Sequence, residues 1–154
     1  MSDATDLYRG VLMEHFHHPR NHGSTEGAQA VSRVDNPLCG DDLEVGVTVT
    51  DGVVSNVTYR ARGCAICIAS GSMMTEVVKG TAVDSVRTVE EAVTGWFAET
   101  DAARPDDLPE PLPALAAVKD FPARSRCVTL AWEALAQALS AAGEGQRSAA
   151  EHDS

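Results

Sequence analysis

Apolar residues recur at helical spacing in four stretches of the chain. These stretches predict helices over Thr5–His17, Ile66–Lys79, Thr88–Phe97 and Ser125–Gly143. Pro19, Gly80 and Gly143 stand where helices commonly stop, and Thr88-Val89-Glu90-Glu91 is typical of a capping box at a helix start. The predicted helices flank a central segment with a different pattern.

Apolar and polar residues alternate between Leu43 and Ala61, which predicts a β-hairpin. A two-residue turn at Asp51-Gly52 would place apolar side chains of one strand opposite polar side chains of the other. We therefore expect a three-residue loop, Thr50-Asp51-Gly52, with Gly52 in the left-handed conformation. This register pairs Val49 with Val53, Val45 with Val57 and Asp41 with Ala61, and it places Cys39 beside Gly63-Cys64.

A third strand is predicted around Val31–Val34. The fold class is therefore α+β, with a small antiparallel sheet of about three strands and helices packed on one face. The 154 residues suit a single domain, which we place at 1–143. The acidic, proline-rich stretch 99–113 is typical of an exposed connector, and we expect 144–154 to be a disordered tail.

The formal net charge of the chain is -11 and its pI is about 4.7. This balance argues against nucleic-acid binding, because neutralising phosphates needs clustered Lys and Arg. The sequence has no run of about 18 apolar residues that could span a membrane. Its N-terminus is acidic, without a basic and apolar leader, so we expect a cytoplasmic protein. Cysteines in that compartment are better metal ligands or nucleophiles than disulfides.

The hairpin register gathers Cys39, Asp41 and Cys64 at one end of the predicted sheet. Cys127 falls in the first turn of the last helix, where the helix dipole favours a thiolate. Zinc accepts thiolate and carboxylate ligands in a tetrahedron, and these four residues could close one. Ordinary buried cysteines are the alternative. Three thiolates and one carboxylate would leave negative charge on a zinc site, which needs nearby cations. Arg124 and Arg126, immediately before Cys127, are the candidates, unless both are solvated.

Four segments together resemble the IscU-like proteins of iron–sulfur cluster assembly. They are Tyr8 with Val11–Phe16 and Pro19–Gly23, then Asn36–Asp41, Gly63–Ile66 and Phe121–Cys127. The resemblance runs from about Tyr8 to Leu139. Arg126 stands where the scaffold branch of this family has a histidine, and Phe121-Pro122-Ala123-Arg124 replaces its chaperone-docking segment. Both features, with the longer stretch between Gly80 and Phe121, are similar to the SufU branch.

The resemblance implies a zinc-dependent sulfurtransferase, a sulfur relay protein rather than a multiple-turnover enzyme on small molecules. Cys39, Asp41, Cys64 and Cys127 would bind zinc, and Cys39 would accept persulfide sulfur. The donor would be a PLP-dependent cysteine desulfurase of the SufS type, whose histidine takes over one zinc position, and the recipient a SufBCD-type assembly complex. Arg124 would support the ligands or contact the partner. A scaffold for a transient iron–sulfur cluster and a structural zinc or adaptor domain are the alternatives.

Cys67 departs from the family pattern, in which a serine is expected. It lies three residues after Cys64 on one helix face, so a spare ligand or a resolving thiol is geometrically possible. Its neighbours Ile66 and Ile68 favour a plain buried thiol. A second metal site is the less favoured interpretation of a group of histidines whose spacing matches no standard site: His15, His17, His18 and His22.

Overall fold

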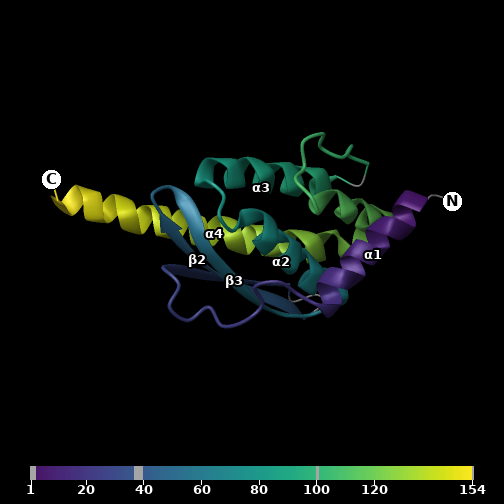
Figure 1. The fold of residues 1–154 in the computed structure, drawn as a ribbon, viewed down its shortest axis with the longest axis horizontal. Coiled ribbons are helices and arrows are strands. Elements are labelled where there is room, and N and C mark those ends of the chain that lie inside the picture. Colours follow the sequence, from purple (N-terminus) through teal and green to yellow (C-terminus); the bar gives the residue numbers. More distant parts are fainter. Residues whose placement is uncertain (1–2, 37–39, 100, 154) are drawn as a thin grey trace.

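The computed structural model describes residues 3–36, 40–99 and 101–153, and the side chains of 6–36, 40–99 and 101–143. Its elements in chain order are α1 (Asp3–His17), β1 (Ala30–Asn36), β2 (Asp41–Thr50), β3 (Val53–Arg62), α2 (Ala65–Val78), α3 (Val83–Ala98), the 3₁₀ helices η1 (Leu112–Asp120) and η2 (Pro122–Arg124), and α4 (Ser125–Asp153). Figure 1 shows α4 running along the length of the molecule beneath α3.

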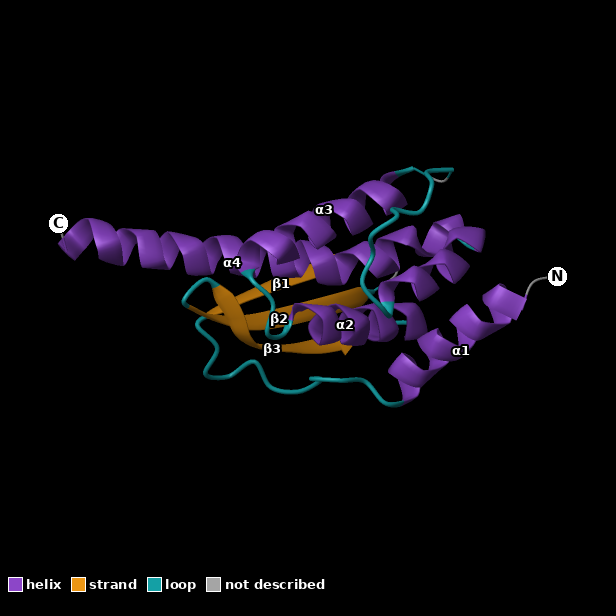
Figure 2. Cartoon of the chain, turned by 45° about the horizontal axis from the view of Figure 1, so that its top comes forward, coloured by secondary structure: helices purple, strands orange, loops and turns teal. Residues whose placement is uncertain are grey.

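The three strands form one antiparallel sheet in the order β1-β2-β3, and helices cover one face of it (Figure 2). The helix α4 packs on β1 and β2, while α2 packs on β3. Alternate residues of β2, namely Leu43, Val45 and Val47, are fully buried beneath these helices. The α+β prediction, with three strands and helices on one face, is confirmed.

The predicted hairpin register is wrong. Asp51 and Gly52 form a two-residue turn with φ of 54° and 78°, and Thr50 pairs with Val53. A β-bulge then shifts the register between Thr48 and Val49. It restores the match of apolar with apolar positions, pairing Val47 with Val57, Val45 with Tyr59 and Leu43 with Ala61. The bulge resolves the parity conflict that the three-residue loop was predicted to resolve.

Two helix ends also differ from the predictions. The helix α3 begins at Val83, because Ala82 pairs with Val53 and the Val83 N–H donates to the Gly52 carbonyl. Thr88 is therefore interior, and its hydroxyl donates to the Asp84 carbonyl instead of capping the helix. The helix α4 continues past Gly143 to Asp153. An interior glycine costs a helix only about 1 kcal/mol relative to alanine, which does not force an end.

The stretch predicted to be an exposed connector contains the start of an unpredicted element. Residues 101–111 form no helix or strand, but Leu112 begins η1, in which Leu112 and Leu115 are fully buried. This 3₁₀ helix packs on α1, and the Arg104 guanidinium before it donates to the Tyr8 hydroxyl. The Met73-Met74 and Trp96-Phe97 pairs are buried in the core.

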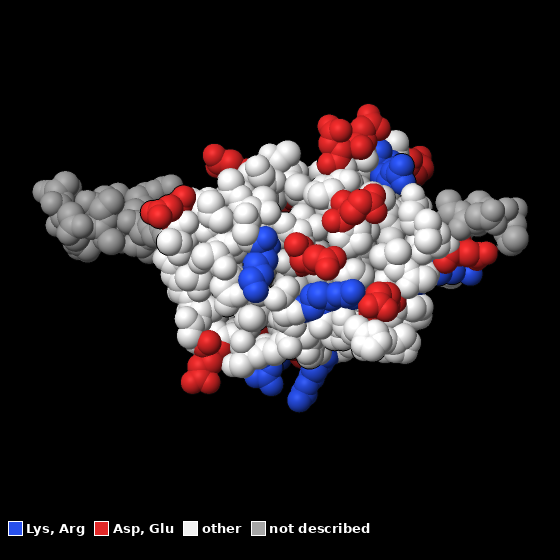
Figure 3. All heavy atoms as spheres, viewed as in Figure 1, with Lys and Arg blue, Asp and Glu red and all other residues white. Residues whose placement is uncertain are grey.

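The charged side chains are dispersed. Figure 3 shows acidic and basic groups interspersed over one face, without a broad basic surface on the face shown. Among the described residues, no helix is both long and apolar enough to cross a membrane.

Candidate metal centre

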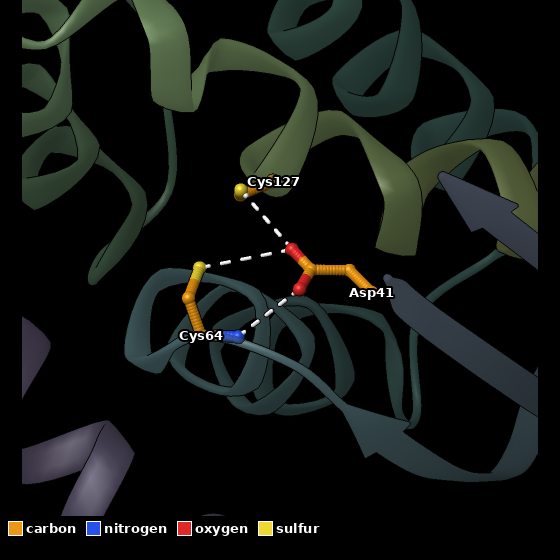
Figure 4. Close-up of side chains that lie close together, drawn as sticks. All are labelled: Asp41, Cys64 and Cys127. Atoms are coloured by element: carbon orange, nitrogen blue, oxygen red, sulfur yellow. Dashed lines mark hydrogen bonds between the residues drawn. The ribbon is translucent and has the colours of Figure 1, made fainter. Parts of the chain in front are cut away.

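Three potential ligands from distant parts of the sequence meet at one end of the sheet (Figure 4). Asp41 is the first residue of β2, Cys64 is the N-cap of α2, and Cys127 is the third residue of α4. One ligand atom from each lies within 4.8 Å of the others. We call these three residues the metal group.

The distances within the metal group suit tetrahedral coordination. The Asp41 Oδ2 atom lies 3.2 Å from the Cys127 sulfur and 3.8 Å from the Cys64 sulfur. Zinc–sulfur bonds of about 2.3 Å and zinc–oxygen bonds of about 2.1 Å would set ligand atoms about 3.5–3.8 Å apart in a tetrahedron. The donors, two thiols and a carboxylate, therefore fit a zinc ion in both chemistry and spacing.

Gly63 makes this arrangement possible. Its φ is 153°, and a Cβ added there would lie 2.3 Å from Asp41 Oδ1. The same Oδ1 atom accepts the Cys64 backbone N–H at 3.2 Å, which turns Oδ2 toward the two sulfurs. Only a residue without a side chain lets the end of β3 approach Asp41 this closely. Sequence reasoning missed this role, although a glycine directly before a cysteine at a strand end was its signal.

The metal group contains a buried carboxylate that no ion pair among the described residues neutralises. Asp41 is 3% exposed, and it takes part in none of the ion pairs among the described residues. A buried carboxylate is normally paired with a cation or bound to a metal. Burial, and then hydrogen bonds with Cys64 and Asp41, raise the pKa of the Cys127 thiol. A bound divalent cation would reverse this balance and hold both thiols as thiolates.

The two arginines before Cys127 have different surroundings. The exposed Arg124 guanidinium lies near the sulfurs of Cys127 and Cys64, where a hydrogen bond with Cys127, and then the charge of Cys64, raise its pKa. Arg126 instead pairs with Glu133 on α4. Of the two cations that the sequence offered, the structure brings only Arg124 to the site.

The fourth predicted ligand, Cys39, lies outside the described residues. The segment that contains it is flanked by Asn36 and Asp41, which pair with each other, and the Gly40 N–H donates to the Asn36 carbonyl at 2.9 Å. Cys67 is fully buried and is not part of the metal group. The histidines form no such group among the described side chains, and the His15 ring bonds to the Ser72 hydroxyl.

A match to a known protein family establishes which family the chain belongs to. The model described as NifU-like N terminal domain matches residues 7–144, almost the whole chain. The chain belongs to the NifU-like N-terminal domain family.

Relatives of this family member carry names from iron–sulfur cluster assembly. The zinc-dependent sulfurtransferase SufU of Bacillus subtilis is 33% identical over 129 residues, which are 84% of this chain and 86% of the relative. The iron–sulfur cluster assembly scaffold protein IscU of Streptococcus pyogenes is 31% identical over 146 residues, which are 95% of this chain and 91% of the relative. The crystal structure of the N-terminal part of a NifU-like protein from Brucella abortus superposes with a TM-score of 0.80 at 25% identity, covering 93% of this chain and 99% of that chain.

Proposed function

We propose that this NifU-like protein acts in iron–sulfur cluster assembly as a zinc-dependent sulfur acceptor. It takes persulfide sulfur from a PLP-dependent cysteine desulfurase at Cys39 and passes it to a SUF-type assembly complex. The observation that carries the proposal is the buried Asp41 carboxylate, which takes part in no ion pair among the described residues and lies at ligand distance from Cys64 and Cys127. The similarity to the zinc-dependent sulfurtransferase SufU supports zinc as the ion.

Four residues would hold the zinc: Cys39, Asp41, Cys64 and Cys127. A zinc ion bound there keeps its cysteines deprotonated at neutral pH. Cys39 is two residues from Asp41, so two peptide units of about 3.8 Å each limit how far its Cα can lie from that of Asp41. Arg124, which faces Cys127 and Cys64, adds positive charge next to a ligand set whose formal charge with zinc is negative.

The transfer step needs only one released thiolate. The Cys39 thiolate attacks the outer sulfur of the desulfurase persulfide, and the sulfur–sulfur bond of that persulfide breaks. The desulfurase cysteine leaves as a thiolate, and Cys39 carries the new persulfide. The other three ligands, which lie on β2, α2 and α4, remain in place through the step.

Cysteine desulfurase turnover with and without the zinc-loaded protein tests this proposal. We expect stimulation that is lost in Cys39→Ala and retained in Cys67→Ser, because Cys67 is fully buried and is not a member of the metal group. The same stimulation from Cys39→Ala would overturn the role of Cys39. No stimulation by an intact, zinc-loaded protein with its own desulfurase would overturn sulfur transfer.

The second candidate function is an iron–sulfur cluster scaffold, which the similarity to the scaffold protein IscU favours. The same cysteine thiolates are suitable ligands for an iron–sulfur cluster. Anaerobic reconstitution with iron and sulfide separates the two candidates, because a scaffold retains a coloured cluster and a zinc protein stays colourless. A cytoplasmic location and the absence of nucleic-acid binding stay predictions.

A further inference from the structure

The helix α2 begins with two cysteines that the proposed sulfur transfer does not use as a pair. Cys64 is the N-cap, with an extended backbone (φ −73°, ψ 167°), and its carbonyl accepts the Ile68 N–H at 3.2 Å. Cys67 lies in the first turn of the same helix. Cys64 is half-buried and Cys67 is fully buried, so small reagents in solvent can reach the first sulfur and not the second.

The backbone already holds the two residues at disulfide spacing. Across one turn of an α-helix, Cα atoms three residues apart are separated by about 5 Å. Disulfides usually join Cα atoms about 4.4–6.8 Å apart. The bond between Cys64 and Cys67 therefore requires rotation of side chains and no rearrangement of α2.

The Cys64 sulfur has two alternative neighbours. In the structure it lies 3.8 Å from Asp41 Oδ2, within the metal group, and Cys67 lies outside that group. If the Cys64 sulfur were bonded to Cys67, it would point away from the metal group and toward the first turn of α2. It also could not serve as a thiolate ligand, because a disulfide sulfur carries no negative charge. Coordination by Cys64 and a bond to Cys67 therefore exclude each other.

We propose that Cys64 and Cys67 form a redox-active pair, in which a low-molecular-weight disulfide oxidises the two thiols to an intramolecular disulfide and removes Cys64 from the metal group. The formation of the disulfide does not depend on the proposed sulfur transfer. Its effect on zinc rests on the proposed zinc site.

The reaction balances with one molecule of oxidant. The Cys64 thiolate attacks the small disulfide, whose sulfur–sulfur bond breaks and releases one thiol, leaving a mixed disulfide on Cys64. The Cys67 thiol then attacks the Cys64 sulfur, its proton passes to the departing small thiolate, and the second small thiol is released. Two protein thiols are oxidised, and one small disulfide is reduced to two thiols.

Tryptic peptides of this chain distinguish a bond between Cys64 and Cys67 from a bond of either residue to another cysteine. Cleavage after Arg33, Arg60, Arg62, Lys79, Arg126 and Arg147 places Cys39 in 34–60, Cys64 and Cys67 together in 63–79, and Cys127 in 127–147. A bond between Cys64 and Cys67 leaves 63–79 unlinked and lighter by two hydrogen atoms. A bond from Cys64 to Cys39 or to Cys127 would instead join two peptides.

The experiment treats the metal-free full-length protein with oxidised glutathione, alkylates the remaining thiols, and measures the peptide masses. We expect 63–79 to carry the internal disulfide. We expect Cys67→Ser, which changes one atom of a buried side chain, to accumulate glutathione on Cys64 instead. In parallel, the zinc-loaded wild-type protein should release its zinc to a chromophoric chelator on oxidation, faster than Cys67→Ser does.

Two results would overturn the proposal that Cys64 and Cys67 form a redox-active pair. One is stable glutathione on Cys64 in the wild-type protein, and the other is a bond that joins 63–79 to another peptide. If the protein binds no zinc, the proposed function fails, but the mass of 63–79 in the metal-free protein still decides for or against the disulfide. Equal rates of zinc release in the two proteins would overturn the link to the metal group.

Discussion

Two partly buried polar clusters of the molecule differ in what completes them. The first joins the end of α1 and the loop after it to α2, and we call it the α1–α2 cluster; its residues are His15, Arg20, Asn21, Ser72, Thr75 and Glu76. The second is the metal group. In the α1–α2 cluster the protein supplies both hydrogen-bond and ion-pair partners, whereas the buried carboxylate of the metal group takes part in no ion pair within the described part of the chain.

The bonds of the α1–α2 cluster are complementary. The Ser72 hydroxyl accepts the Arg20 backbone N–H at 2.8 Å and can donate to His15 Nδ1 at 2.7 Å. The other ring nitrogen of His15 lies 3.6 Å from a Glu76 carboxylate oxygen. Thr75 donates to the Arg20 carbonyl at 3.1 Å. We infer that this cluster stabilises the fold, and that the metal group is built to hold an ion.

The largest expected effect is the gain in stability on zinc binding, which should depend on the metal group and not on the α1–α2 cluster. With free zinc at a thousand times its Kd, binding should stabilise the wild-type protein by about 4 kcal/mol. Because Cys127 is a proposed ligand, Cys127→Ser should lower the zinc affinity at least about 100-fold, which removes about 2.7 kcal/mol of that gain. Chemical unfolding with and without zinc measures both values. An unchanged zinc gain in this variant would remove Cys127 from the site.

The second effect is a loss of stability in the α1–α2 cluster, and it should be independent of zinc. Ser72→Ala removes the partner of both His15 Nδ1 and the Arg20 N–H, and unpaired buried polar groups cost about 1–3 kcal/mol. The free energy of unfolding should fall by this amount in metal-free and zinc-loaded protein alike. A loss confined to zinc-loaded protein would show that the two clusters are not separate.

A smaller effect is the loss of stability as the pH falls. Burial, and then the charge of Arg20, lower the pKa of His15 from 6.5, while Glu76 and Glu14 act in the opposite direction. The unfolded chain therefore binds more protons than the folded one below pH 6.5, and metal-free protein should lose stability as pH falls from 6.5 toward the lower folded-state pKa. Melting temperatures at about pH 7.5 and about pH 5.5 should differ less in His15→Gln than in wild type. An equal difference in both proteins would assign the pH dependence to other groups.

The smallest expected effect compares two exposed arginines. Arg124→Ala removes a guanidinium that faces Cys127 and should weaken zinc binding about tenfold. Arg126→Ala is its matched control, because Arg126 pairs with Glu133 and should leave zinc affinity unchanged. Competition with a chromophoric chelator measures both affinities. Equal losses would attribute the effect to net charge alone.

The sequence predicted the types of the elements better than their ends. Periodicity identified the strands and the longer helices, because burial of one face imposes it. The hairpin register was wrong because a bulge after Thr48 absorbs the parity mismatch, and no periodicity reports a bulge. The start of α3 was missed because the pairing of Ala82 with Val53, a contact between distant residues, sets it. The short 3₁₀ helix η1 has no helical repeat long enough to recognise.

The composition of the site was easier to predict than its geometry. The observed register differs from the predicted one by two residues, which preserves the strand face and still brings Asp41 to Gly63-Cys64. Cys127 comes from a helix that no strand register places, so ligand chemistry and the family resemblance, not geometry, put it with the other ligands. Ligand chemistry and spacing could not separate Arg124 from Arg126, since their directions depend on how η2 passes into α4, and only the family resemblance singled out Arg124.

The location of the transferred sulfur tests the central claim most directly. The zinc-loaded protein is mixed with its desulfurase and L-cysteine for one turnover, and the tryptic peptides are weighed without reduction. We predict one additional sulfur atom on 34–60, which contains Cys39 as its sole cysteine. Additional sulfur on 63–79 or 127–147, or none on this protein while the desulfurase stays persulfidated, would contradict the account.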